Sequence, residues 1–249
     1  MRWQNIGRHY RLLVIVAIGT AILIRLGLWQ LARAEEKSIR TESFAARLSK
    51  ESLPLAELRE ANVDLIHWRR ATAVGRFTGA VLLLDNRTYH GQVGTEVLSP
   101  FEYANGVTVL VNRGWVRTSL DRQILPEITT GSGQLTISGH IGPPPVTGLK
   151  FNSAADDIEV LGTNLMRIQS VNLPTIGERL KIKLAPFVVY LDAESKEGFA
   201  RQWPTPGDGS AKHKAYAVQW FAMAFVLIVI TLLLIIQRNK GSKSGNGNR

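Results

Sequence analysis

The chain has 249 residues, which is room for one soluble domain of ordinary size and additional segments. Its net charge is +10, but the 18 basic and 18 acidic residues between Ser38 and Ala211 cancel. The excess of basic residues therefore lies near the two ends of the chain, beside two long apolar runs. A central domain without net charge argues against nucleic-acid binding, which requires a basic face on the folded domain. The lack of cysteine excludes disulfides, thiolate metal sites, thiol catalysis and covalent C-type haem attachment.

The first expected element is a transmembrane helix over residues 12–32. Its uninterrupted apolar part, residues 12–24, ends at Arg25, and the apolar run then continues to residue 32. At about 1.5 Å per residue this length can cross a bilayer. Arg25 can extend towards the interface, and Trp29 is typical of an interfacial anchor. The alternative is a cleaved signal peptide with its cleavage site at 32–34, because residues 12–24 alone have signal-peptide length.

The middle of the chain has the composition of a β-rich domain. Residues 41–60 have helical spacing of apolar side chains with a break near Pro54, and residues 171–180 are expected to form a short helix. Elsewhere β-branched and aromatic residues dominate. A change of texture from residue 65 leads into a stretch over residues 74–84 that is followed by a turn at Asp85-Asn86-Arg87. Strands are expected over residues 95–103, 107–118, 134–141, 159–169 and 186–191, with a hairpin turn at Asn105-Gly106 and loops at 143–145 and 204–210.

The second apolar run is the clearer membrane helix. Residues 215–236 contain no charge, and a helix of this length spans about 33 Å. Tyr216 and Trp220 stand near its first turns, where interfacial aromatic residues belong. The tail over residues 241–249 is expected to be too polar to fold.

These elements predict a membrane protein of the α+β class. Two transmembrane helices flank a mainly antiparallel β-sheet or barrel-like domain with peripheral helices. The expected boundaries are a tail over 1–11, a helix over 12–32, the domain over 33–211, a second helix over 212–237 and a tail over 238–249.

The charges around the two helices predict the topology. Both termini lie on one side of the membrane, and they carry seven basic residues without a side-chain acid, against a net three positive charges on the domain side. The positive-inside rule therefore favours cytoplasmic termini and an exported domain. The terminal residues are Arg2, Arg8, Arg11, Arg238, Lys240, Lys243 and Arg249; those on the domain side are Arg25, Arg33, Lys37, Lys212 and Lys214, offset by Glu35 and Glu36.

The sequence carries no catalytic signature of the GxSxG, P-loop, HExxH or GxGxxG type. The adjacent Asp156 and Asp157 would point to opposite faces of a strand. His67, His90 and His140 have no companion ligand at metal spacing and are interpreted as surface or structural residues. We therefore expect no enzyme; a membrane-tethered hydrolase with dispersed catalytic residues is a rival hypothesis.

His213 stands at the start of the second helix, between Lys212 and Lys214. On a helix it shares one face with Tyr216 and Trp220. An imidazole is a good iron ligand, and basic side chains at this depth can pair with haem propionates. The same residues can equally mark a membrane interface, where polar side chains are common, so composition leaves both interpretations open.

The segment Val111-Asn112-Arg113-Gly114-Trp115 also has two interpretations. Arg113 and Trp115 either form a packed strand end in which Arg113 binds a carboxylate, or they present a polar surface to a partner. The sequence does not decide between them.

Together these motifs resemble the Surfeit locus protein 1 family, the assembly factors of haem–copper cytochrome oxidases. Five short elements occur in the family's order between and within the two apolar runs. They are Leu26-Gly-Leu-Trp-Gln-Leu31 with Arg33 and Lys37; Gly75-Arg-Phe77; Asp85-Asn-Arg87 with Gly91 and Pro100-Phe101; Val109-Leu-Val-Asn-Arg-Gly-Trp115; and His213 with Tyr216-Ala-Val-Gln-Trp-Phe221. The stretch 151–169 departs from the family, since it lacks the Trp/Tyr-rich segment that many members carry there.

The resemblance implies two membrane helices around an exported domain and a role in building the catalytic subunit of the oxidase. Bacterial members are linked with haem A, and the histidine of the last element, here His213, is the implied iron ligand. Expected partners are the oxidase catalytic subunit, haem A synthase and the lipid bilayer, but no nucleic acid. Candidate partner-binding residues are Arg87, Asn112, Arg113 and Trp115.

We therefore expect a non-enzymatic assembly chaperone in the bacterial inner membrane, with a periplasmic domain. His213 would hold haem A transiently and non-covalently in a gap between the two helices at the outer interface. Trp29, Tyr216 and Trp220 would lie beside the ring, and Arg25 would be a further contact. The alternative is a scaffold that binds the oxidase subunit without handling haem.

Overall fold

The computed structural model describes residues 2–58, 63–103, 106–119, 121–131, 133–146, 157–203 and 205–244, and the side chains between residues 10 and 238. The chain divides into two compact units. One consists of Met1–Ser43 together with Thr205–Arg249, and the other is Phe44–Pro204. Each unit is described below by itself.

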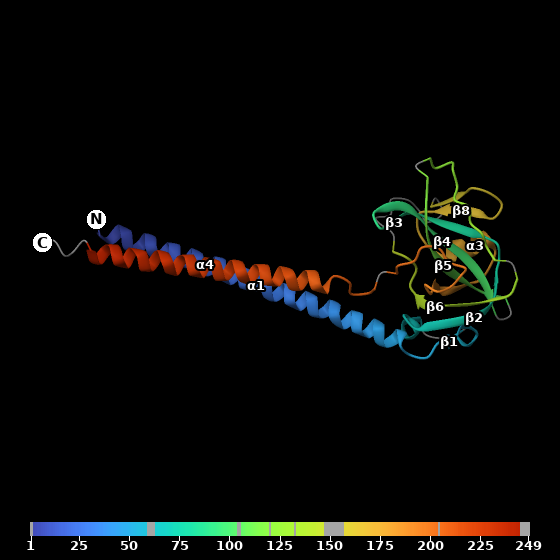
Figure 1. Ribbon diagram of the computed structural model, residues 1–249, viewed down its shortest axis with the longest axis horizontal. Coiled ribbons are helices and arrows are strands. Elements are labelled where there is room, and N and C mark those ends of the chain that lie inside the picture. The colour runs from blue at the N-terminus through green and yellow to red at the C-terminus, as the bar shows by residue number, and fades with distance from the viewer. Residues whose placement is uncertain are drawn as a thin grey trace. The chain divides into compact units, whose positions relative to one another are not determined.

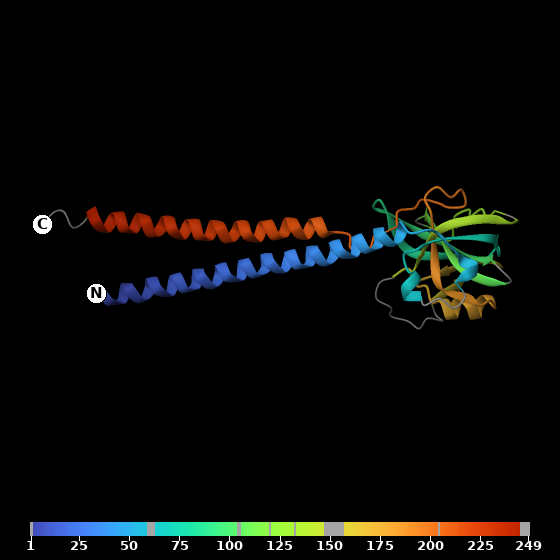
Figure 2. The same cartoon turned by 90° about the horizontal axis from the view of Figure 1, so that it is seen from below.

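The first unit is a pair of long helices that lie side by side and antiparallel (Figures 1 and 2). Helix α1 covers Arg2–Leu48 and helix α4 covers Ser210–Ser244. Both contain a stretch, Tyr10–Leu48 and Ser210–Arg238, that is long and apolar enough to cross a membrane. The two predicted membrane helices are therefore confirmed as helices of the required length and hydropathy.

Both helices are longer than the sequence predicted. The transmembrane span was expected to end at residue 32, whereas helix α1 continues without a break to Leu48 and includes the first part of the helix expected over 41–60. The polar tail expected from residue 241 is helical as far as Ser244. A polar segment can extend a helix whose preceding turns already exist, because adding one residue to a formed helix costs far less than starting a new one.

The second unit contains one sheet whose described strands follow the order β1-β2-β6-β9-β5-β4-β3-β8-β7. An additional pairing between β2 and β4 closes β2, β6, β9, β5 and β4 into a ring, so this part of the sheet is a small barrel. Most neighbours are antiparallel, as predicted. The strands are β1 Leu53–Pro54, β2 Arg70–Phe77, β3 Val81–Tyr89, β4 Gln92–Tyr103, β5 Val107–Arg117, β6 Leu135–Gly142, β7 Ile158–Val160, β8 Leu165–Ile168 and β9 Leu184–Leu191; the short helices are η1 Leu55–Glu57, α2 Val63–Ile66 and α3 Leu173–Leu180.

Two local predictions in the sheet are wrong. Asp85-Asn86-Arg87 is not a turn but a β-bulge within β3, where Asn86 takes a left-handed φ of 56° and the register against β4 shifts. The chain reverses instead at His90 and Gly91, whose φ values of 48° and 76° suit a type I′ hairpin turn. The single strand expected over 159–169 is a hairpin of β7 and β8.

Other local predictions are confirmed. Strands β4 and β5 form the hairpin expected around Asn105-Gly106, with Gly106 at a φ of 82°. Helix α3 forms where a short helix was expected, and the side chain of Asn172 caps it by accepting a hydrogen bond from Thr175 N at 3.1 Å. Several expectations fall on residues outside the described ranges, namely those for Asn105, 151–156 including Asp156, Pro204, 245–249 and the side chains of Arg2, Arg8, Lys240 and Lys243.

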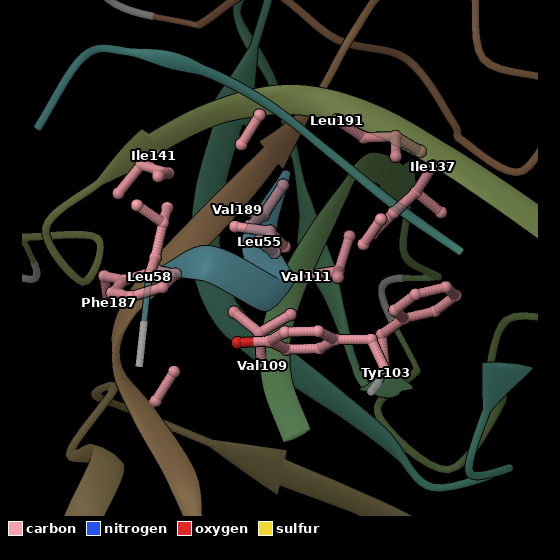
Figure 3. Close-up of a cluster of buried hydrophobic side chains, with 14 of the residues drawn as sticks. Leu55, Leu58, Tyr103, Val109, Val111, Ile137, Ile141, Phe187, Val189 and Leu191 are labelled. Atoms are coloured by element: carbon pink, nitrogen blue, oxygen red, sulfur yellow. The ribbon is translucent and has the colours of Figure 1, made fainter. Parts of the chain in front are cut away.

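The main hydrophobic core fills the barrel (Figure 3). Side chains from the strands converge on Leu55 and Leu58, which are almost completely buried. Leu55 is the first residue of η1, and Leu58 follows its last residue. Their helical spacing misled the sequence prediction, but their apolar character was informative, since both enter the core. A second cluster lies under α3, where Leu173 and Ile176 pack with Met166 and Ile168 of β8.

Candidate functional site

His213 faces the neighbouring helix. Its Nδ1 atom lies 2.7 Å from Oε1 of Gln30, so the first turn of α4 is hydrogen-bonded to α1 across 183 residues of sequence. The imidazole is half-buried. Gln30 was not among the predicted site residues, although it belongs to the Leu26–Leu31 element that the sequence analysis singled out.

The two helices are in direct contact at several levels. Gly27 is buried, and a Cβ atom at its position would lie 2.6 Å from Cε1 of Phe221, so only glycine permits this approach. A Cβ atom on Gly19 would make an ordinary contact with Leu227 at 3.7 Å. Among the residues 10–43 and 205–238 of this unit, the other buried positions are also small: Ala34, Ala217 and Ala224. Such residues let helix backbones approach closely in membranes.

These contacts correct the predicted gap between the helices. The Phe221 ring packs directly against the backbone of Gly27, and Gln30 bridges directly to His213. A porphyrin therefore does not fit between α1 and α4 at this level. Any planar group that His213 binds has to approach from the flank of the helix pair.

The other predicted ring neighbours are not gathered in one pocket. Trp29 is 52% exposed and Tyr216 is 53% exposed, whereas Trp220 is half-buried. Arg25 is exposed and lies two residues from the buried Gly27, which is a rotation of about 200° around the helix axis. Arg25 therefore lies on the side of α1 opposite Gly27, and its contact with a bound group stays a prediction.

The donor set fits a single axial ligand. Among the described residues, no group of three histidine, aspartate or glutamate side chains could hold a bare metal ion. His213 is an imidazole with one nitrogen bound to an amide oxygen, which is the usual arrangement for a metal-ligating histidine. The residues thus suit a haem attached through one imidazole on an open flank, and they do not suit an enclosed cage.

In the domain, Arg113 is buried and fully engaged. Its guanidinium donates to the carbonyl oxygens of Glu197 at 2.8 Å and Thr129 at 2.8 Å, and to Oγ1 of Thr130 at 3.1 Å. It also lies over the rings of Phe77 and Phe199. Burial lowers the pKa of Arg113, and the nearby Glu197 partly offsets this shift. The predicted exposed contact with a partner is therefore wrong for Arg113, which instead holds two loops together.

Arg87 and Asn112 meet at a carboxylate that sequence reasoning missed. Oε1 of Glu96 accepts from Nε of Arg87 at 2.7 Å, and Oε2 accepts from Nδ2 of Asn112 at 2.7 Å. Asn112 is fully buried, so it too cannot be a surface contact. Trp115 is half-buried and donates its indole N–H to the backbone oxygen of Arg87 at 3.1 Å. Of the four candidate partner-binding residues, Arg87 and Trp115 retain exposed surface.

Arg87 and Glu96 also line a small aromatic cavity that the sequence did not indicate. The volume of this cavity is about 200 Å³, and its walls include Trp68, His140, Tyr190, Trp203 and the segment 143–146. The His140 ring stacks on Tyr190 at 5.2 Å, and the Tyr190 hydroxyl donates to Pro143 O at 2.8 Å. Trp68 has a φ of 67°, a strained value for a bulky residue. No local pattern could reveal this cluster, because its members come from distant segments.

Burial keeps the cavity walls uncharged. It lowers the pKa of His140 to about 4, with Asp192 partly opposing the shift, and it raises the pKa of Tyr190. The imidazole and the phenol are therefore neutral near pH 7. The described walls then carry one ion pair, Arg87–Glu96, and otherwise apolar or neutral surface.

The comparisons with known proteins show the family of the chain. The sequence profile of the SURF1 family matches residues 17–225. A SURF1-like protein of Rickettsia felis is 28% identical over 233 residues, covering 91% of this chain and 96% of the relative. A SURF1-like protein of Rickettsia conorii is 26% identical over 226 residues, with 88% and 89% covered, and an uncharacterized SURF1-like protein of Mycobacterium tuberculosis is 25% identical over 220 residues, with 86% and 78% covered. Because the profile covers most of both units, the chain belongs to the SURF1 family.

Proposed function

We propose that this protein assists the assembly of a haem–copper cytochrome c oxidase by holding haem A at His213 and passing it to the catalytic subunit. Members of the family are known as assembly factors of cytochrome oxidase, and the chain has the two apolar helices that membrane anchoring requires. The observation that carries the haem step is the half-buried imidazole of His213, bound through one nitrogen to Gln30 at the start of an apolar helix.

Haem A is the cargo in this proposal. Nε2 of His213 is the nitrogen that would bind the iron, because Nδ1 is engaged by the Gln30 side chain. Lys212 and Lys214 are exposed on either side and can pair with the propionates. The exposed rings of Trp29 and Tyr216 lie on residues of the same unit and suit the apolar flank of a porphyrin in lipid. A single axial ligand on an open flank favours release to an acceptor.

The proposed location is the inner membrane of a bacterium, with both termini in the cytoplasm and the domain in the periplasm. The excess of basic residues at the two termini supports this orientation. In that orientation His213 lies near the periplasmic interface, since it precedes the apolar part of α4. The periplasmic side is where the domain can meet an oxidase subunit.

The proposed partner is the oxidase catalytic subunit, with haem A synthase as the donor. The exposed parts of Arg87 and Trp115 are the predicted contacts that remain accessible on the domain. The protein would act as a chaperone and not as an enzyme, because its residues bind and orient a cargo without transforming it. The lipid bilayer completes the site by covering the flank of the helix pair.

The test is the visible spectrum of the full-length protein, purified in detergent from cells that make haem A. The wild type should carry a haem spectrum, and His213→Ala should lose it. His90→Ala, which removes an exposed imidazole of the domain, should keep it. A full-strength spectrum in His213→Ala would refute haem binding at this residue, and a colourless wild type would favour the alternative of a scaffold that binds the oxidase subunit alone.

A further inference from the structure

The contact between His213 and Gln30 joins two sequence elements that lie far apart in the chain. We infer that Gln30 is the positioning residue of the site: its amide oxygen fixes which nitrogen of His213 carries the proton and which is free to bind iron. This inference rests on the proposed function, since it concerns the same imidazole. It goes further than the proposal, which uses Gln30 only as the partner of Nδ1, because it makes Gln30 responsible for the tautomer and the ligand strength of the imidazole.

The chemistry follows from the atoms that meet. An amide oxygen can only accept a hydrogen bond, so Nδ1 of His213, at 2.7 Å from Oε1 of Gln30, is the donor and carries the proton. A neutral imidazole has one N–H, which leaves the lone pair on Nε2. Gln30 thereby selects the tautomer that can bind a metal through Nε2, the nitrogen farther from the helix backbone.

The same hydrogen bond makes the imidazole a stronger ligand. A hydrogen bond accepted from the distal N–H of a ligating histidine raises the basicity of the other nitrogen and fixes the orientation of the ring. The imidazole is half-buried, which limits the access of water to Nδ1 and makes this hydrogen bond stronger than one at a fully solvated surface.

The packing of the helices explains why Gln30 reaches His213. Gly27 lies one turn before Gln30, and the ring of Phe221 packs against its backbone, which joins the two helices next to Gln30. Ala34 lies one turn after Gln30 and is buried, so it leaves that approach unobstructed. Two turns beyond Gln30 along α1, the Nζ of Lys37 donates a hydrogen bond to Asp208 O at 2.9 Å. This bond fixes the segment that precedes α4. The register that aligns Gln30 with His213 is thus set by contacts on both sides.

A hydrogen bond between two membrane helices could serve only to join them. The two roles differ in what they do to bound haem. A purely structural contact would change how much protein folds, but it would not change the electronic properties of the iron. A positioning role predicts opposite shifts in reduction potential when the acceptor is removed and when it is made anionic, because a more basic imidazole stabilises ferric over ferrous iron.

The experiment titrates full-length protein in detergent with hemin and then measures the reduction potential of the complex. Gln30→Leu should weaken hemin binding by about 10- to 100-fold and raise the potential. Gln30→Glu should retain binding and lower the potential, since a carboxylate is a stronger acceptor than an amide. Gln219→Leu is the matched control: it makes the same chemical change at an exposed position of α4 and should leave both quantities unchanged.

The outcomes separate this inference from the proposed function. If His213→Ala loses hemin binding while Gln30→Leu keeps the affinity and potential of the wild type, Gln30 has no positioning role and the proposed function stands. If His213→Ala binds hemin as the wild type does, the proposed function fails, and the inference fails with it. If Gln30→Leu and Gln30→Glu shift the potential in the same direction, a structural role replaces the positioning role.

Discussion

The helix pair and the β-domain differ in how completely their polar side chains are buried and hydrogen-bonded. In the domain, Arg113 is 2% exposed, donates to two backbone oxygens and a hydroxyl, and is covered by two phenyl rings. His140 is equally enclosed, stacked on Tyr190 within an aromatic cluster. In the helix pair, His213 is only half-buried, and a single amide engages one of its two nitrogens.

The difference separates structural polar groups from those available for binding. A side chain whose donors are all used inside the domain can only stabilise the fold, because withdrawing any of them leaves an unpaired buried group. An imidazole with one nitrogen hydrogen-bonded and the other accessible has a fixed orientation and can still bind a ligand through the second nitrogen. By this criterion Arg113 is structural, and His213 is the residue suited to a ligand.

The largest effect on stability is expected from Arg113→Met. The substitution removes the guanidinium and leaves the carbonyl oxygens of Glu197 and Thr129 without their donor, so the free energy of unfolding should fall by about 3–5 kcal/mol. Urea unfolding of the purified protein, followed by the circular dichroism of the sheet, measures this loss. Arg76→Met is the control, because Arg76 is 68% exposed in its ion pair with Glu102 and should cost less than about 1 kcal/mol. Equal losses in the two variants would contradict a structural role for Arg113.

A somewhat smaller effect is expected from the titration of His140. Burial lowers the pKa of His140 from 6.5 to about 4, so the unfolded chain binds a proton at a pH where the folded domain does not. The free energy of unfolding is therefore unaffected by His140 above about pH 6.5. It falls as the pH drops below that value and levels off near pH 4, with a total loss of roughly 3 kcal/mol.

Unfolding curves between pH 7 and pH 4.5 check this expectation. The variant His140→Phe keeps an aromatic ring against Tyr190 but cannot be protonated, so it should lose less stability on acidification than the wild type. His90→Asn, which removes an exposed imidazole where asparagine tolerates the positive φ, should respond to pH as the wild type does. Parallel curves for wild type and His140→Phe would show that the folded domain takes up the proton near pH 6.5.

The smallest effect is expected from Tyr190→Phe. The substitution deletes the hydroxyl that donates to Pro143 O at 2.8 Å and keeps the ring stacked on His140, so it should cost about 1 kcal/mol. The melting temperature, recorded by circular dichroism, should fall by a few degrees. An unchanged melting temperature would indicate that water replaces the lost donor and that this side of the cavity is open.

Long periodic signals in the sequence predicted the architecture well. The two apolar runs, the β-rich middle and the helix ending at Leu180 are properties of contiguous residues, and each follows from local composition. The bulge at Asn86 was mistaken for a turn because asparagine favours left-handed φ in both settings. The apolar Leu55 and Leu58 were assigned to a helix, although their spacing arises because both enter the barrel core.

The sequence identified one of the two residues that meet at the candidate site. His213 could be chosen from its position at the start of an apolar helix and from its motif. Gln30 could not, because its role depends on the register of two helices separated by the whole domain. The same reason hid Glu96, which Arg87 and Asn112 reach from different strands. Burial of Arg113 and Asn112 was likewise a tertiary property, and the choice between internal and external contact required the fold.

The tight contact between Gly27 and Phe221 has a consequence for how a bound porphyrin would travel. A flat molecule cannot slip through a seam that excludes even one methyl group, so it would arrive and leave sideways, within the plane of the bilayer. Exchange with a second membrane protein would then be an encounter in two dimensions, with the ring of the cargo moving through lipid.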